Sequence, residues 1–190
     1  LAGRTVCVDL GRADGRPFLL MASAGWDAGI VRDVSLGLKR RIGDLAYGVR
    51  AALAMPRLRP TPAQWEIDGT RHHGSLALMV VSNTRLYGGR VRFTPLALAD
   101  DGQLDVVALC PDGPLDVARM SGRLLMRRVA GDGHVQAARA AAVVLETAGI
   151  PVQLDGDYAG ETPVRFSVDP GALTVSIPAG AQPEILSGPD

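Results

Sequence analysis

Apolar and polar residues alternate along much of the chain, and this pattern predicts β-strands with one buried face each. Residues 6–10 and 18–24 are expected to form strands, and the Gly- and Pro-containing stretch 11–17 between them predicts the turn of a first hairpin. Further strands are predicted at residues 65–68, 75–82, 90–94, 104–109, 142–147 and 152–154. The chain is therefore expected to be mainly β.

The clearest alternation lies near the C-terminus. Residues 164–168 and 173–177 each place an apolar residue at every second position. Residues 169–172, with the sequence Asp-Pro-Gly-Ala, suit a type II turn, because Pro fits its second position and Gly its third. The pattern predicts a hairpin made of these two strands.

Two segments show the spacing of helices instead. From residue 38 to residue 53, apolar residues recur every three or four positions, and Pro56 marks the end of this predicted helix. Pro114 opens a second predicted helix that reaches about Val129. Since alternating strands must bury one face each, we expect a two-layer antiparallel β-sandwich with two peripheral helices.

Composition limits the architecture and the partners. A chain of 190 residues with 47% hydrophobic and 21% charged residues fits one globular domain. We expect the sandwich to span residues 1–178 and the Pro-, Gly- and Ala-rich residues 179–190 to form a loose tail. Basic and acidic residues number 20 each, so no nucleic-acid partner is expected. No apolar run approaches the about 18 residues that a membrane-spanning helix needs.

Cysteine usage and the first residues bear on location. Cys7 and Cys110 lie in apolar stretches, where such residues usually behave as small buried hydrophobes, and a disulfide is not indicated. The first residues lack the charged and apolar regions of a secretory signal. A cytoplasmic location is expected.

Several motifs occur together in one order along the chain. They are residues 18–28, Lys39 with residues 43–47, Ser82-Asn83, Gly88-Gly89, residues 95–105, Gly133-His134 and residues 152–157. This pattern resembles the bacterial diacylglycerol kinases and related lipid kinases, and more distantly the sphingosine and ceramide kinases. The resemblance covers about residues 6–178 but only the family's C-terminal domain.

The resemblance implies an ATP- and Mg²⁺-dependent kinase that phosphorylates a lipid hydroxyl such as that of diacylglycerol. ATP would be held mainly by an N-terminal nucleotide-binding domain that is absent from this chain, so the chain alone is expected to be inactive. No Gly-rich phosphate-binding loop followed by a helix is found, because Gly88-Gly89 suits a strand break better.

Asp155-Gly156-Asp157 follows an apolar strand. From the residues alone, an Asp-Gly turn is the favoured interpretation, and a carboxylate that serves as a general base is the alternative. The resemblance implies that the final carboxylate, Asp157, accepts the proton of the lipid hydroxyl. The family usually has the longer Glu there, so Asp155 stays as the alternative base.

Residues 99–103 form a second acidic turn, which composition alone explains as a hairpin turn with solvated acids. The resemblance implies a structural Mg²⁺ in this loop, held by the Asp101 carboxylate and by the backbone carbonyl groups of Leu98 and Gln103. Hard cations prefer such oxygen ligands.

Ser23, Gly25 and Asp27 follow another apolar strand and suit an ordinary strand-end turn. The resemblance implies that this turn faces the lipid, where Asp27 would hydrogen-bond a headgroup hydroxyl. Adjacent His72 and His73 point to opposite faces of a strand, so they cannot share one metal and are expected at the surface.

His134 is expected to have a structural hydrogen-bonding role. Arg119, Arg123 and Arg127 fall four apart on the second predicted helix. A solvated helix face is the favoured interpretation, and docking to the inner face of the membrane is the alternative.

Two other functional classes stay open. The chain could be a non-catalytic module that binds a lipid or another small ligand, or a purely structural β-sandwich. Neither the particular lipid nor the oligomeric state is predicted.

Overall fold

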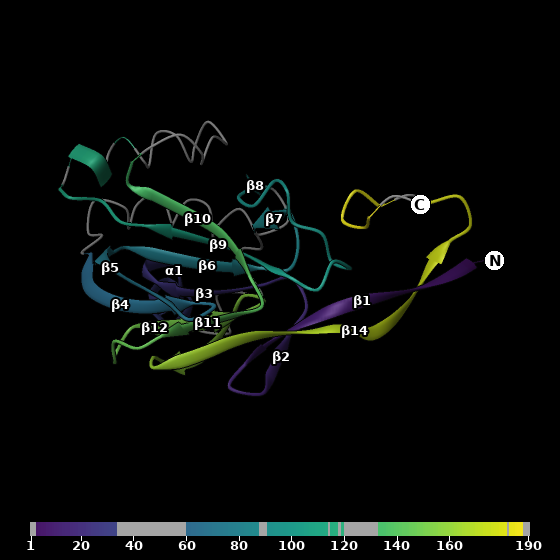
Figure 1. Cartoon of the computed structure of the whole chain (residues 1–190), viewed down its shortest axis with the longest axis horizontal. Coiled ribbons are helices and arrows are strands. Elements are labelled where there is room, and N and C mark those ends of the chain that lie inside the picture. The colour runs from purple at the N-terminus through teal and green to yellow at the C-terminus, as the bar shows by residue number, and fades with distance from the viewer. Residues whose placement is uncertain are drawn as a thin grey trace.

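The computed structural model describes residues 3–33, 60–87, 91–113, 115–117, 119, 133–181 and 183–187. In these residues two six-stranded antiparallel sheets pack face to face, and the predicted two-layer β-sandwich is confirmed (Figure 1). The first sheet has the order β2 (Arg16–Phe18), β1 (Gly3–Ala13), β14 (Val164–Pro178), β11 (Ala142–Leu145), β4 (Thr61–Ile67) and β5 (Thr70–Leu76). The second has the order β10 (Val135–Ala140), β9 (Leu104–Leu109), β6 (Leu78–Ser82), β3 (Met21–Gly25), β12 (Pro151–Leu154) and β13 (Asp157–Glu161). A separate short pair is formed by β7 (Leu86–Tyr87) and β8 (Val91–Arg92).

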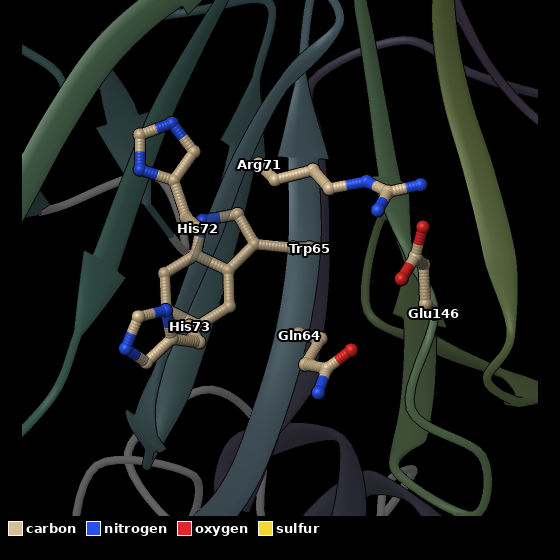
Figure 2. A pocket seen from close by; sticks show the side chains of 6 residues that line it. All are labelled: Gln64, Trp65, Arg71, His72, His73 and Glu146. Atoms are coloured by element: carbon tan, nitrogen blue, oxygen red, sulfur yellow. The ribbon is translucent and has the colours of Figure 1, made fainter.

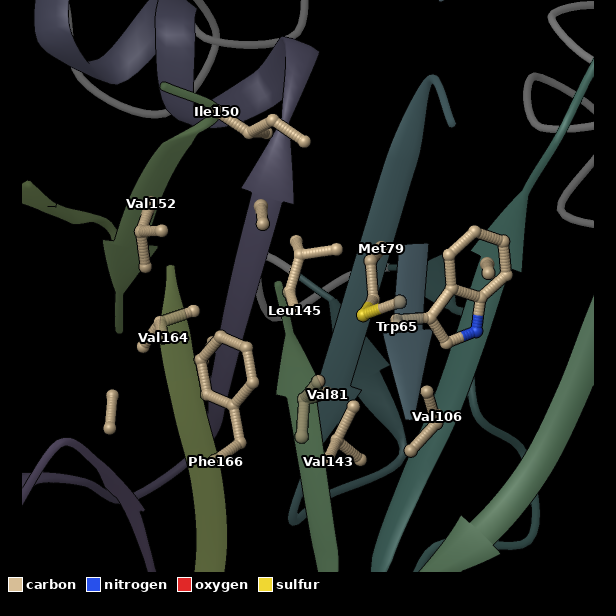
Figure 3. Close-up of a cluster of buried hydrophobic side chains, with 14 of the residues drawn as sticks. Trp65, Met79, Val81, Val106, Val143, Leu145, Ile150, Val152, Val164 and Phe166 are labelled. Atoms are coloured by element: carbon tan, nitrogen blue, oxygen red, sulfur yellow. The ribbon is translucent and has the colours of Figure 1, made fainter. Parts of the chain in front are cut away.

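The hydrophobic core fills the space between the two sheets (Figure 3). The first sheet contributes Trp65 and Phe166, and the second contributes Met79, all at most 1% exposed. Trp65 on β4 is the register partner of Leu145 on β11, so the two side chains enter the core side by side. Burial of such large side chains stabilises the sandwich by about 1.5–3 kcal/mol each.

Asp-Gly pairs close two hairpins of the first sheet. Asp14-Gly15 joins β1 to β2 with φ values of 46° and 83°, and Asp68-Gly69 joins β4 to β5 with 44° and 83°. Positive φ at both central residues is the mark of the turn whose twist matches that of the strands it joins. These turns fix the register of the edge strands β2 and β5.

The predicted C-terminal hairpin is wrong. Residues 164–178 form one continuous strand, β14, which pairs with β1 from Phe166 to Pro178 (Figure 1). Residues 170–172 form a bulge opposite Asp9, because Leu10 pairs with Asp169 while Val8 pairs with Leu173. An alternating pattern on both sides of an insertion looks the same for a bulged strand as for two strands, so the sequence did not separate them.

The predicted pairing of residues 6–10 with residues 18–24 in a first hairpin is also wrong. β1 turns back into β2, and the chain then crosses to the second sheet, where β3 pairs with β6 and β12. Residues 18–24 are thus divided between two sheets.

One helix was not predicted. The helix α1 covers Trp26–Asp33, where a strand-end turn was expected. The predicted helix at residues 38–53 lies outside the described residues. Of the second predicted helix, the backbone is helical at residues 115–117 and 119, and the remainder lies outside the described residues. No helix in the described part of the chain is long and apolar enough to cross a membrane.

The cysteines and the C-terminal segment complete the fold. Cys110 is buried as predicted, whereas Cys7 is exposed, and both are free thiols. Cys7 lies on β1 opposite Thr174, so the apolar stretch around it did not imply burial. The backbone carbonyl group of Ile185 accepts a hydrogen bond of 2.7 Å from the N–H of Ala99, and the N–H of Ser187 donates to the carboxylate of Asp100.

Candidate functional site

The β12–β13 turn carries the two predicted carboxylates. Asp155 has a φ of 48° and, with Gly156 at 88°, forms the turn itself, so the Asp-Gly turn is confirmed. The Asp155 carboxylate accepts hydrogen bonds from the backbone N–H groups of Leu19, Leu20 and Met21 at 2.6, 2.8 and 2.9 Å. Both oxygens of Asp155 are used in this way, so this residue ties the turn to the segment between β2 and β3.

Asp157 differs from Asp155 in its position, although both residues are exposed. Asp157 is the first residue of β13, and Leu154 is its register partner across the turn. An exposed carboxylate at the start of this strand can meet a molecule that approaches from solvent.

A buried chain of polar side chains runs behind this turn. Gln153 on β12 lies directly opposite Ser23 on β3, and its Nε2 donates a hydrogen bond of 2.8 Å to Ser23 Oγ. Ser23 in turn donates to the carboxylate of Asp27 in a short hydrogen bond. At the other end, the N–H of Gly156 donates to Gln153 Oε1 at 2.6 Å. We call Asp27, Ser23 and Gln153 the buried relay, since all three are at most 4% exposed.

Sequence reasoning found Ser23 and Asp27 but missed Gln153, which connects them to the carboxylate turn. A polar residue in the middle of the apolar strand β12 was the available signal. A buried amide needs hydrogen-bond partners, and Gln153 finds them in Ser23 and Gly156.

Gly25 has a role that requires the absence of a side chain. Its φ is 121°, and a Cβ atom would lie 2.5 Å from the backbone oxygen of Ala77. This close approach lets the N–H of Trp26 donate a hydrogen bond of 3.1 Å to the same oxygen. Gly25 thereby sets the position at which β3 ends and α1 begins, just before Asp27.

The predicted metal loop presents one carboxylate that already has a cationic neighbour. Asp101 Oδ1 accepts the N–H of Gln103 at 3.0 Å, and Asp101 Oδ2 forms an ion pair with Arg139. Asp105 lies 3.7 Å from the same guanidinium group. Burial raises the pKa of Asp105, Arg139 opposes this effect, and Asp101 adds to it.

The donor set of this loop fits a hard cation, because a carboxylate and two carbonyl groups offer only oxygen ligands. Leu98 is half-buried, and Gln103 is exposed. A cation bound to Asp101 would share this carboxylate with Arg139 or displace it. The assignment of Leu98, Asp101 and Gln103 as metal ligands stays a prediction.

Asp9 and Asn83 connect the metal loop to the carboxylate turn. Asp9 is 2% exposed, and its carboxylate accepts the N–H groups of Gly102 and Gly171, each at 2.7 Å. Asn83 Nδ2 donates to the backbone oxygen of Asp9 at 2.9 Å and to that of Leu19 at 3.1 Å. Sequence reasoning missed Asp9, although an acidic residue inside an apolar strand indicates a buried carboxylate that needs hydrogen-bond partners.

Three large exposed side chains belong to segments that form or contact the carboxylate turn. Leu19, Leu20 and Tyr158 are 39%, 45% and 39% exposed, and we call them the apolar rim. The backbones of Leu19 and Leu20 are held by Asp155, and Tyr158 follows Asp157. Exposed apolar groups that gather beside a polar site often mark a binding surface.

The predicted histidines lie elsewhere. A pocket of about 230 Å³ is lined by Gln64, Trp65, Arg71, His72, His73 and Glu146 (Figure 2). His73 is exposed, while His72 is half-buried and stacks on Trp65 with ring centroids 6.1 Å apart. None of the carboxylates predicted for the site lines this pocket.

The chain resembles proteins of known family over most of its length. Residues 21–177 match the family described as the YegS C-terminal NAD kinase beta sandwich-like domain. A protein named "Probable lipid kinase YegS-like" from Pseudomonas syringae pv. tomato is 34% identical over 191 residues, which cover 96% of this chain and 61% of the relative. A protein named "Diacylglycerol kinase" from Bacillus subtilis is 29% identical over 160 residues, which cover 84% of this chain and 53% of the relative.

Solved structures agree with these matches. The crystal structure of a diacylglycerol kinase from Bacillus anthracis superposes with a TM-score of 0.61 at 18% identity, over 90% of this chain and 53% of that protein. This likeness shows the same fold. The chain spans little more than half the length of these relatives. The matched domain and the sequence identity together show that the chain belongs to the family of YegS and the bacterial diacylglycerol kinases, as a C-terminal β-sandwich domain of that family.

Proposed function

We propose that this chain is the substrate-side domain of an ATP- and Mg²⁺-dependent lipid kinase. The reaction transfers the γ-phosphate of ATP to a hydroxyl group of diacylglycerol or a related lipid. The proposal rests on two observations at the carboxylate turn: Asp157 is exposed, and the exposed apolar residues Leu19 and Leu20 donate their backbone N–H groups to the neighbouring Asp155. A lipid alcohol needs both features, because its hydroxyl group must lose a proton while its acyl chains avoid water.

Asp157 is assigned as the general base. Phosphoryl transfer depends mainly on positioning and charge neutralisation, and the base orients the hydroxyl group and accepts its proton. Asp155 has both oxygens bound by backbone N–H groups. Its role is therefore to hold the turn that presents Asp157.

The buried relay supports the turn from behind. Asp27 is 4% exposed and Ser23 is fully buried, and hydrogen bonds through Gln153 connect them to the carboxylate turn. Asp27 would meet a headgroup hydroxyl only where the lipid reaches below the surface. Gly25 keeps the backbone there close to Ala77.

The metal and the nucleotide have separate places in this proposal. Asp101 and the carbonyl groups of Leu98 and Gln103 would hold Mg²⁺, which when bound supplies positive charge to the loop. ATP would be bound by a domain outside this chain, so the chain alone would not turn over. The names of the relatives, a lipid kinase and a diacylglycerol kinase, support this class of reaction.

We also propose peripheral contact with the inner face of the membrane, because the substrate resides there. Arg119 is exposed, while Arg123 and Arg127 lie outside the described residues. Vesicle sedimentation of the parent and of a variant with Arg119, Arg123 and Arg127 changed to Glu tests this contact. Unchanged binding to anionic vesicles would argue against it.

The activity is tested with the full-length protein, radiolabelled ATP, Mg²⁺ and a panel of lipids in mixed micelles. Transfer of label to a lipid with a free hydroxyl group is the expected result. Lipid binding without any transfer of label would instead support a non-catalytic lipid-binding module. Absence of both would leave neither function standing.

A further inference from the structure

A cluster of metal-ligating side chains lies outside the site just described. Asp112, Asp116 and His134 each offer one ligand atom, and these atoms all lie within 4.8 Å of one another. His134 Nδ1 is 3.5 Å from Asp112 Oδ2, and His134 Nε2 is 3.6 Å from Asp116 Oδ1. The imidazole of His134 therefore lies between two carboxylates that come from another segment of the chain.

Backbone hydrogen bonds hold the two segments together. The N–H of Cys110 donates to the backbone oxygen of His134 at 2.8 Å, which fixes the start of β10 against the segment after β9. The N–H groups of Asp116 and Val117 both donate to the backbone oxygen of Gly113 at 3.1 Å. The fold thus brings His134 to the two carboxylates, which belong to one segment of the chain.

The charges in the cluster favour a cation. The ligand oxygens of Asp112 and Asp116 lie within 4.8 Å of each other, so their negative charges repel. The Asp116 and His134 side chains are only 16% and 26% exposed, so water screens these charges incompletely. Arg119 lies 3.4 Å from Asp116 but is 61% exposed. An exposed ion pair of this kind contributes little.

We propose that Asp112, Asp116 and His134 bind one divalent transition-metal ion, of which Zn²⁺ is the best fit. One imidazole nitrogen and two carboxylate oxygens are ligands that Zn²⁺ accepts in a tetrahedral site, and the fourth position stays open to water. An imidazole ligand disfavours Mg²⁺, which prefers oxygen.

Binding requires a rearrangement, because Asp112 faces Nδ1 of His134 and Asp116 faces Nε2, whereas one ion is held by only one of these nitrogens. Metal–ligand bonds of about 2.0–2.2 Å in a tetrahedron separate the ligand atoms by about 3.4 Å, so the atoms must close from their present spacing. Asp112 is 83% exposed and is the side chain that can move. The bound ion would link residues 112–116 to the start of the edge strand β10. It would share no ligand with the site predicted at the Asp101 loop.

The test uses the full-length protein after treatment with a chelator. Calorimetric titration with Zn²⁺ and thermal melting are compared for the parent, His134→Gln, Asp112→Asn and the matched control His73→Gln, which changes an exposed histidine outside the cluster. We expect binding of one ion and a higher melting temperature in the parent and control. Both cluster variants should bind at least about tenfold more weakly.

Titration with Co²⁺ adds a spectroscopic readout, because its visible absorption reports the geometry and the ligands of the ion. The parent should show the intense bands of a four-coordinate site, and His134→Gln should lose them. Asp112 is exposed, so Asp112→Asn keeps the test valid if His134→Gln fails to fold. Absence of Zn²⁺ binding in the parent, or equal binding by Asp112→Asn, would overturn the proposal.

Discussion

Gln153 and Ser23 face each other across β12 and β3, and the amide of Gln153 donates a hydrogen bond of 2.8 Å to the hydroxyl oxygen of Ser23. Because the same amide accepts the N–H of Gly156, one side chain joins the buried Ser23 to the carboxylate turn. The position of Asp157 thus depends on a residue that does not contact solvent.

Replacing Gln153 by Leu is expected to destabilise the domain. The change leaves the N–H of Gly156 without this acceptor and removes a donor to Ser23, which costs about 1–3 kcal/mol for each buried group left unpaired. Chemical denaturation monitored by Trp fluorescence measures the loss. Gln64 is an exposed glutamine and serves as the control, since Gln64→Leu should leave the free energy of unfolding almost unchanged.

Asp9→Ala is expected to loosen two loops together. Asp9 holds the N–H groups of Gly102 and Gly171, and hydrogen bonds to a charged group contribute about 1.5–3 kcal/mol each. Hydrogen exchange at these two amides should accelerate more than at amides in the middle of β9. Unchanged protection at both glycines would show that the carboxylate does not hold the loops.

The sequence was sufficient for the class of fold and for part of the site. Alternation predicted most strands of both sheets but missed β10 and β13. It also did not show which strands pair, since pairing is decided by tertiary contacts such as those of β3 with β6. The bulge at residues 170–172 looked like a turn because Asp9, whose carboxylate accepts the N–H of Gly171, is 162 positions upstream of that glycine. Local patterns carry no record of such distant partners.

Gly25→Ala should be far more damaging than the same change at Gly15. Both glycines have positive φ, but only at Gly25 would the new Cβ atom meet a backbone oxygen, at 2.5 Å, whereas nothing lies within 4 Å of it at Gly15. We expect a loss on the order of 3 kcal/mol or more for Gly25→Ala and about 1–2 kcal/mol for Gly15→Ala. Thermal and chemical unfolding measure both, and equal losses would contradict the close packing at Ala77.

The two thiols should differ in reactivity. Burial raises the pKa of Cys110 to about 11 from 9.0, while Cys7 is exposed. At pH 8 a thiol reagent should label Cys7 rapidly and Cys110 only on unfolding, and Cys7→Ser should abolish the rapid phase. Since the folded state holds the Cys110 proton more tightly, its contribution to stability is complete below pH 9 and declines as pH rises toward 11. Rapid labelling of both thiols in the native protein would contradict the burial of Cys110.

The candidate site was predictable where its residues belong to local motifs. Asp155, Asp157 and Asp101 lie in or next to turns, Ser23 and Asp27 lie around the end of β3, and the resemblance to a family singled all of them out. Gln153 and Asp9 are buried polar residues inside strands, and their importance follows from the partners they reach. Their sequence signal was an isolated polar residue in an apolar run, which by itself does not name a partner.

The central claim is that Asp157 is the general base and that Asp155 holds the turn, and paired substitutions in the full-length protein test it most directly. Asp157→Asn should lower the rate of lipid phosphorylation by about 10²- to 10⁴-fold with little change in melting temperature. Asp155→Asn should mainly lower the melting temperature, because it weakens the acceptor of three backbone N–H groups. Glu161→Gln, which changes another exposed acid of β13, is the matched control and should keep the parent rate. Full activity of Asp157→Asn would contradict the account.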